Sequence, residues 1–471
     1  MVLLMPVGAW AENGPDLYEG SVQIEPSDAP SAISSRPLFS AAAASGPEVR
    51  DSTAELVDLP RAIELALKNN PEIRMRVSEI DEAMALRDKV GGERWPALKM
   101  VGGFTEYRRE QRLYPAAKPG EPAVVSRYIA GEDLVLSLPL FTGGRLSSSL
   151  RASDLAAQSA RYAGERTRAE VAFRVTVLYY GILAQRHLCT ALAADEAALQ
   201  GHVRTLTALV EQRKAAPLDR QRVEVRLAAL QQRRIQEESM LRSQTLTLWS
   251  LLSPDEHARP IRVVGELAPP PVTSRYSEDE WMQKALTRRP DYLAARTAAQ
   301  AQDERVRAAR AAYWPQLSLL GSYGLRQAPW PTDRPAGTDA GADVGQIGVA
   351  MDLPVFQGGR IGAAIRVEQA RSTLAAERLR QVGLRIRVEV ETALLDLGSA
   401  MERVTVSETA LAQASEAFRV ETEKNAAGRS TISEVLSAEA DLAEAEANRA
   451  RGVADANTAL AALKLVAGEE P

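Results

Sequence analysis

Few residues of this chain have types and spacings that could support catalysis or metal binding. The three histidines, His187, His202 and His257, are scattered and lack metal-ligand spacing. The sequence contains no P-loop, no G-x-G-x-x-G fingerprint and no G-x-S-x-G turn. The single cysteine, Cys189, lies within a long proline-free stretch, and we interpret it as a small core residue. The sequence therefore predicts no enzyme, no cofactor and no bound metal.

Two carboxylates remain as candidates for a charged function. Asp219 and Glu434 lie 215 residues apart, and each closely follows a break between two long proline-free stretches. If several copies surrounded a lumen, such residues would form rings that favour cations and repel one another. The alternative is that each carboxylate occupies the first turn of a helix, where it is favoured by about 0.3–1 kcal/mol. The sequence leaves both interpretations open.

The residues around these carboxylates belong to a unit that the chain contains twice. The segment Leu138-Pro139-Leu140-Phe141-Thr142-Gly143-Gly144-Arg145 recurs as Leu353-Pro354-Val355-Phe356-Gln357-Gly358-Gly359-Arg360, with six of eight positions identical. Asn70-Pro71 matches Arg289-Pro290, and Trp95-Pro96 matches Trp314-Pro315, both at an offset of 219. A period this long does not fit a solenoid and indicates one large duplicated unit.

Each copy is expected to contain two short helices, a pair of strands and a long helical hairpin. The first copy begins with short helices at 59–69 and 71–91, the second starting at a proline that suits a first helical turn. Proline-free runs predict the hairpins, and alternating runs predict the strands. The expected strands are about 97–107, 128–140, 316–326 and 344–355, and the expected long helices about 145–214, 218–252, 360–425 and 430–466.

The expected strands have the pattern of membrane strands. Leu134, Leu136 and Leu138 share one face of the second strand, and about ten alternating residues suit a tilted strand that crosses a bilayer. Tyr107, Tyr128 and Tyr323 could form an interfacial aromatic girdle. No stretch of 18 uncharged apolar residues occurs, so the sequence predicts no transmembrane helix.

The rest of the chain completes the expected domain organisation. Residues 1–11 include an Ala9-Trp10-Ala11 cleavage pattern and are interpreted as a signal-peptide remnant, the alternative being an ordinary frayed terminus. Residues 12–55 form an N-terminal extension, 56–252 the first repeat, 253–276 a linker and 277–467 the second repeat. A net charge of −5 gives no reason to expect nucleic-acid binding.

The repeated motif marks the junction between strand and helix. Pro139 and Pro354 close the strand runs, and the pairs Gly143-Gly144 and Gly358-Gly359 precede the long helices. Glycine permits the sharp bend that a strand needs to continue directly as a helix. Four strands cannot close a barrel, and an open sheet edge cannot face lipid. The chain is therefore expected to form an oligomer.

Together, the duplicated motifs resemble the TolC-like family of outer-membrane efflux channels over roughly residues 55–467. The resemblance implies a mixed, mainly α fold, with four strands per chain joining a twelve-stranded transmembrane β-barrel in a homotrimer. It also implies that the strands lie in the outer membrane of a Gram-negative cell, surrounded by outer-membrane lipid. The long helices would form an α-helical coiled-coil barrel in the periplasm. The chain would be a passive exit duct of a tripartite efflux or type I secretion system. The chain departs from the lipid-anchored branch because it has no cysteine near its start.

The resemblance also implies partners and a tip site. A periplasmic adaptor, the membrane fusion protein, and an inner-membrane pump would contact the hairpin tips and open the duct. The family often shows a glycine followed six residues later by an acidic residue and valine, and Gly428, Glu434, Val435 and Leu436 match this pattern. Asp219 is the first-copy counterpart of Glu434, but Arg213 stands where Gly428 predicts glycine, and Arg220 follows instead of valine.

Two other protein classes would also fit parts of the sequence. A soluble coiled-coil scaffold explains the helices but not the strand pairs inserted at the same point of both copies. A periplasmic adaptor explains a helical hairpin, but it would carry one hairpin flanked by β-rich domains, whereas this sequence predicts two long hairpins. The sequence does not identify the cargo, which could be a drug, a metal ion or a polypeptide.

Overall fold

The computed structural model describes residues 55–112, 125–214, 216–252, 261–271, 277–328, 330 and 341–469. The expected signal-peptide remnant at 1–11 and most of the N-terminal extension lie outside this part of the chain. Nearly all described residues belong to helices and strands, which follow one another in the same order in both copies. This confirms a mixed, mainly α fold with four long strands and two long helical hairpins.

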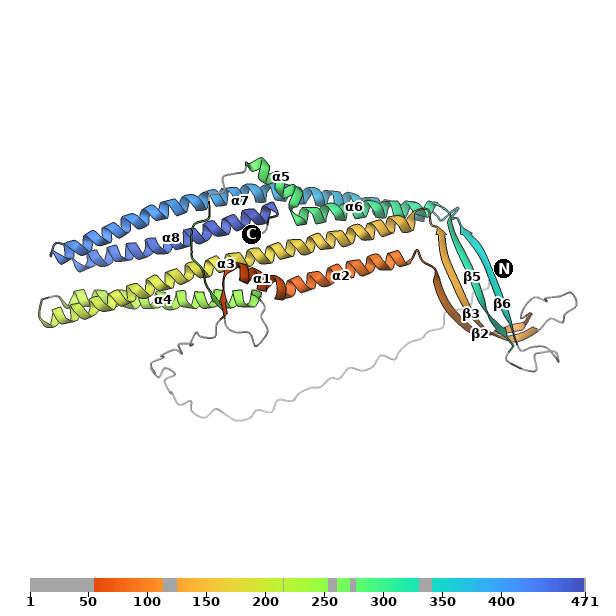
Figure 1. The fold of residues 1–471 in the computed structure, drawn as a ribbon, viewed down its shortest axis with the longest axis horizontal. Coiled ribbons are helices and arrows are strands. Elements are labelled where there is room, and N and C mark those ends of the chain that lie inside the picture. Colours follow the sequence, from red (N-terminus) through yellow and green to blue (C-terminus); the bar gives the residue numbers. More distant parts are fainter. Residues whose placement is uncertain are drawn as a thin grey trace, which may run out of the picture. The chain divides into compact units, whose positions relative to one another are not determined.

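The long helices have matching lengths in the two copies (Figure 1). α3 and α7 have 67 residues each, which corresponds to about 100 Å, and α4 and α8 have 36 residues each. Shorter helices precede each strand pair. The helices are α1 Leu59–Asn69, α2 Pro71–Gly92, α3 Arg145–Glu211, α4 Pro217–Leu252, α5 Glu278–Arg288, α6 Pro290–Arg310, α7 Arg360–Ala426 and α8 Ile432–Ala467, with a 3-10 turn at Ala311–Tyr313.

The four long strands form one antiparallel sheet in the order β2-β3-β5-β6 (Figure 1). Their bounds are β2 Ala97–Arg112, β3 Val125–Phe141, β5 Gln316–Gln327 and β6 Gly341–Asp352. The two repeats meet at the centre, where Leu134 of β3 lies opposite Tyr323 of β5. β2 and β6 are the edges, and neither has a second pairing partner in the described residues.

Three strands differ in extent from the sequence expectation. β6 was expected to reach about residue 355 but ends at Asp352, because Pro354 has no N–H to continue the ladder. β3 instead continues past Pro139 to Phe141, with a register shift against β5 at that point. β2 is longer than expected and pairs again at Gln111 after an irregular stretch that contains Tyr107.

The expected linker is not merely a connection. Residues Ile261–Val263 form strand β4, which pairs in parallel with β1, Glu55–Val57, at the expected end of the N-terminal extension. The sequence did not reveal this strand pair, because three-residue strands are too short to show alternation. Val57 and Val263 enter the core of the first repeat beside Val171, Leu248 and other buried residues. The linker therefore belongs in part to the first repeat.

The repeats pack along α3. This helix contacts α6 at one end and α8 further along, in addition to α2 and α4 of its own repeat. α7 packs against α5, α6 and α8 of the second repeat. Large apolar side chains remain exposed on α2, α4 and α7. They are Met75, Val77, Met84 and Leu86 on α2, Leu218, Val225, Ile235, Met240 and Leu246 on α4, and Val367, Leu374, Leu384, Val388, Leu395 and Val406 on α7.

No helix within the described ranges is both long enough and apolar enough to cross a membrane. The same ranges contain no group of three or more His, Cys, Asp or Glu side chains arranged to hold a metal ion.

Candidate functional site

The turn of the second hairpin is built around Gly428. α7 ends at Ala426, and Gly428 adopts a left-handed φ of 69°. The Gly428 N–H donates to the Asn425 carbonyl at 2.9 Å, and the Arg429 N–H donates to the Lys424 carbonyl at 2.8 Å. This pair of hydrogen bonds is a Schellman motif, which ends a helix and reverses the chain.

Glu434 is part of a capping box at the start of α8. Its carboxylate accepts a hydrogen bond from the Thr431 N–H at 2.7 Å, and the Thr431 hydroxyl accepts one from the Glu434 N–H at 3.3 Å. The Ser430 hydroxyl lies 2.8 Å from a carboxylate oxygen of both Glu421 and Glu434. The Thr431 N–H, followed by the Ser430 hydroxyl, holds the pKa of Glu434 below its usual range. The carboxylate is thus directed at its own turn.

The turn of the first hairpin has the same backbone but different side chains. Arg213 adopts φ 57°, and its N–H donates to the Val210 carbonyl at 2.9 Å. The Lys214 N–H donates to the Leu209 carbonyl at 2.8 Å. Arg213 therefore occupies the left-handed position that Gly428 occupies in the second copy. Sequence comparison aligned Arg213 with Gly428 but gave no reason to expect the same backbone, because arginine is not the residue that this conformation favours.

Asp219 does not repeat the role of Glu434. It lies in the first turn of α4, where Ala216 stands at the position of Thr431 and offers no hydroxyl for a capping box. Its carboxylate is 3.9 Å from the Arg222 guanidinium, on the half-exposed surface of the helix. The structure places Asp219 and Glu434 in equivalent turns of two different hairpins.

Val435 and Leu436 are each only 5% exposed within the chain. Leu436 packs against Leu199, Leu206 and Val223 of the first hairpin. Leu436 therefore fixes the position of α8 on the first hairpin, and Val435 is buried beside it in sequence. Among the five expected tip residues, Gly428, Asp219 and Glu434 retain surface exposure.

The strand-to-helix junctions contain the two glycine pairs. Gly143 and Gly144 have φ of 62° and 88°, and Gly358 and Gly359 have φ of 59° and 81°. A Cβ on Gly143 would lie 2.5 Å from the Trp314 Cβ, so the first junction packs directly against the Trp-Pro motif of the second repeat. No atom of the described chain lies near a Cβ on Gly358. Pro139 and Pro354 precede these turns by a few residues.

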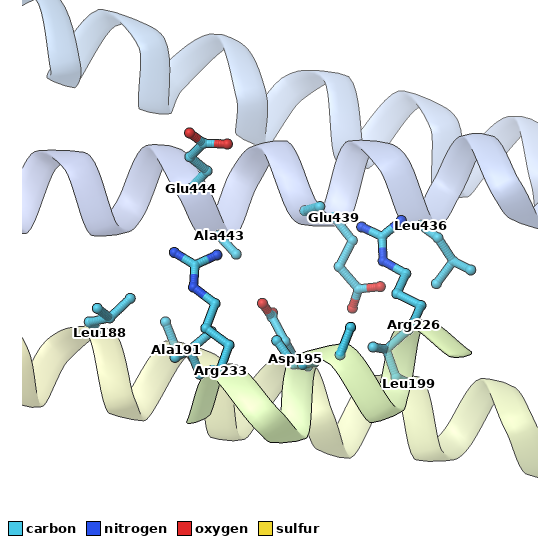
Figure 2. Close-up of a pocket in the computed structure, with 14 residues that line it drawn as sticks. Leu188, Ala191, Asp195, Leu199, Arg226, Arg233, Leu436, Glu439, Ala443 and Glu444 are labelled. Atoms are coloured by element: carbon cyan, nitrogen blue, oxygen red, sulfur yellow. The ribbon is translucent and has the colours of Figure 1, made fainter. Parts of the chain in front are cut away.

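A partly enclosed cavity of about 260 Å³ lies between α8 and the helices of the first hairpin, beside their contacts. Figure 2 shows Asp195 of α3 and Glu439 of α8 pointing toward one another across it, with Arg226 and Arg233 of α4 beside them. Burial, followed by the charges of Glu439 and Glu446, raises the pKa of Asp195 to about 6. Burial also raises the pKa of Glu439.

This charged seam was missed at the sequence level, although a signal was present. Leu188, Leu192, Asp195 and Leu199 follow one another at helical spacing on a single stripe of α3. A carboxylate within an apolar stripe indicates a special environment. Its partner Glu439 could not be identified, because 244 residues separate the two in sequence.

The chain matches a known family over most of its length. A sequence model of the family described as "Outer membrane efflux protein" matches residues 62–253 and 281–469, one segment in each repeat. Outer membrane protein OprJ of Pseudomonas aeruginosa is 26% identical over 333 residues, which cover 68% of this chain and 64% of that protein. Outer membrane efflux protein BepC of Brucella suis is 30% identical over 159 residues, about a third of each chain.

Solved structures have the same fold. The outer-membrane channel OprN is 21% identical with a TM-score of 0.71, covering 88% of this chain and 91% of that one. CusC, described as forming a transmembrane channel, is 18% identical with a TM-score of 0.73, covering 88% and 94%. VceC of Vibrio cholerae is 19% identical with a TM-score of 0.70, covering 87% and 96%. The chain belongs to the outer membrane efflux protein family and is an outer-membrane protein with a large periplasmic helical part.

Proposed function

We propose that the chain forms a homotrimer that acts as a passive exit duct. Three four-stranded sheets would close a twelve-stranded barrel in the outer membrane, and the long helices would form a tunnel through the periplasm. The duct would serve a tripartite efflux or type I secretion system. Efflux is in the family description, and the names of the matched relatives place them in the outer membrane.

One observation supports this assembly above all others: each contact between the two repeats has an unfilled counterpart. Within the chain, β3 pairs with β5, α3 packs on α6 and α8, and Gly143 packs on Trp314. The counterpart surfaces are β6 and β2, α7 with α2 and α4, and Gly358 with Trp95, which is 74% exposed. A neighbouring copy would fill each counterpart with the same geometry, so the contact is head-to-tail and closes a ring.

Two properties of the sheet favour a membrane location for the ring. One face carries exposed apolar side chains, including Met100, Leu134 and Val349. Phe104 stacks on Tyr128 at 6.1 Å between ring centroids, and Tyr128 meets Trp330 edge-on at 6.0 Å, as expected near a membrane interface. Lipid tolerates no open strand edge, so β2 and β6 must be paired in the assembled protein.

The repeat also predicts the register between copies. Transferring the in-chain pair Leu134 and Tyr323 by the repeat offsets places Val349 of one copy opposite Phe104 of the next. In a Cys189→Ala background, Val349→Cys combined with Phe104→Cys should give disulfide-linked dimers and trimers on oxidation. Gln346→Cys with Phe104→Cys is the control, because Gln346 lies on the other face of β6.

Light scattering of the detergent-extracted protein, followed by conductance in planar bilayers, tests the whole proposal. The expected mass, corrected for detergent, is that of three chains of 51.0 kDa. A water-soluble monomer that forms no conducting pore would refute the duct.

Contact with an adaptor and pump is assigned to the hairpin tips, at Asp219, Gly428 and Glu434. Val435 and Leu436 would contribute by holding α8 in place, since both are buried. Reversing the charge with Glu434→Lys tests whether the carboxylates also form a ring in the lumen. Unchanged conductance and an unchanged ratio of cation to anion permeability would leave Glu434 with its capping role alone.

A further inference from the structure

The two faces of the four-stranded sheet differ in chemistry. Seven consecutive pairing levels, from Ala97 to Gly103 along β2, span the sheet from edge to edge. Leu98, Met100, Leu134 and Ile347 are among the residues of one face. Small and polar residues make up most of the other face, which would line the lumen of the proposed barrel. Over these levels the charged residues of the lumen face are Lys99, Asp133 and Arg326.

Arg326 of β5 and Asp133 of β3 form a bidentate ion pair across the boundary between the repeats. Arg326 Nη1 donates to Asp133 Oδ1 at 2.8 Å, and Nη2 donates to Oδ2 at 2.7 Å. Such bidentate pairs are geometrically specific and stronger than single contacts. The guanidinium passes over Gly131, where a Cβ would lie 2.9 Å from Nη1. The absence of a side chain at Gly131 lets Arg326 lie close to the strand, paired with Asp133.

Lys99 differs from Arg326 because no acidic side chain in the described residues forms an ion pair with it. It lies on β2 opposite Val135, four pairing levels from Gly103, and its side chain is exposed. The lumen face of these levels therefore carries one paired arginine and one lysine without a counter-charge. In a trimer, each would occur three times around the barrel.

We propose that this face is an electrostatic filter favouring anionic solutes, in which Lys99 supplies the net charge and Asp133 neutralises Arg326. The inference rests on the proposed duct, because the face becomes a lumen only in the closed barrel. Rings of like charge on a pore wall favour ions of the opposite sign. Because Asp133 neutralises Arg326, it limits the positive charge on this face and therefore the strength of the preference for anions.

Reversal potentials across a KCl gradient test the filter in the reconstituted full-length protein. Lys99→Gln should lower the ratio of chloride to potassium permeability by about twofold, because it removes the unpaired charge. Asp133→Asn should raise that ratio because Arg326 loses its counter-charge. Arg326→Gln should lower it because three carboxylates are left unpaired. The shifts should grow as ionic strength falls.

Two controls separate charge from structure. Glu132→Gln changes a carboxylate on the neighbouring residue of β3, which faces the opposite side of the sheet, and should leave the reversal potential unchanged. The double variant Asp133→Arg with Arg326→Asp restores a neutral pair and should return the wild-type value. Lys99→Gln does not touch the ion pair, so it remains informative if an Asp133 variant fails to assemble.

The outcomes distinguish the two proposals. A wild-type protein that forms no conducting pore would overturn the duct itself. A conducting trimer whose reversal potential is the same in the wild type and in the Lys99, Asp133 and Arg326 variants would overturn the filter and leave the duct intact.

Discussion

At the scale of single residues, the two hairpin turns keep one backbone with different side chains. Gly428 and Arg213 both take the left-handed conformation that a Schellman motif requires. Glycine adopts it without steric cost, whereas a residue with a Cβ loses about 1–2 kcal/mol there. The first turn is therefore the more strained of the two, although its hydrogen bonds have the same lengths.

Arg213→Gly should stabilise the protein against unfolding by about 1 kcal/mol, because it removes the left-handed strain. Gly428→Ala should destabilise it by a similar amount for the opposite reason. Denaturant unfolding in detergent, compared at a single pH, measures both effects. A less stable Arg213→Gly variant would mean that contacts of the guanidinium outweigh the strain of its backbone.

At the scale of elements, the seam between α8 and the first hairpin depends on titratable groups. Asp195 interacts electrostatically with Glu439 and Glu446 of α8 and with Arg226 and Arg233 of α4, whereas Glu444 points away from it (Figure 2). On α3 itself, His202 lies 3.9 Å from Glu439, and burial lowers the pKa of this histidine. The carboxyl pair is thus surrounded by groups of both signs, and like charges face each other across the cavity.

From the raised pKa of Asp195 we predict that the free energy of unfolding falls as pH rises. Its folded pKa of about 6 exceeds the ordinary value of 3.8, so the folded state binds more protons between these values. The loss should run through about pH 6, be complete about one pH unit higher, and amount to about 3 kcal/mol. Asp195→Asn should weaken this dependence in unfolding experiments between pH 4 and pH 7.5 and leave the contribution of Glu439, whose pKa burial also raises, whereas Asp441→Asn, on the exposed surface of α8, should retain it in full. Equal slopes for the wild type and Asp195→Asn would contradict the assignment.

Element order was predictable from sequence because long proline-free runs and ten-residue alternation are strong local signals. The strand pair β1 and β4 was not, since three residues carry no period and their partners lie about 200 residues apart. The ends of α3 and α7 depended on backbone torsion at Arg213 and Gly428, and only the glycine was visible in sequence. The seam around Asp195 and the ion pair at Arg326 required knowledge of how distant elements pack.

At the scale of the whole molecule, the duplication makes contacts inside one chain and contacts between chains equivalent. The first junction packs on Trp314, and the second junction has no such neighbour within the described chain. The proposed assembly gives Gly358 the corresponding contact with Trp95 of the adjacent copy. The exposed apolar residues of α2, α4 and α7 lie on the surfaces that this arrangement would cover.

Trp95→Ala should therefore weaken the trimer, because a buried tryptophan contact between copies would be lost. Truncating a buried tryptophan costs about 3–5 kcal/mol, so the trimer should dissociate at lower temperature in native gels. Tyr323→Ala, which changes an exposed ring on the sheet, should leave the trimer as stable as in the wild type. Identical dissociation temperatures for Trp95→Ala and the wild type would argue against the proposed contact.

The pairing of β1 with β4 also constrains the order in which the chain can fold. Val57 and Val263 lie on opposite sides of the first repeat in sequence, yet both belong to its core. A chain that emerges from its amino end must hold Val57 without a partner until residues beyond the first hairpin are available. Contacts this distant in sequence slow folding, because a long loop must close first. The first repeat consequently completes its core only after the linker residues that contain β4 have been synthesised. Until then, its helices must avoid aggregation.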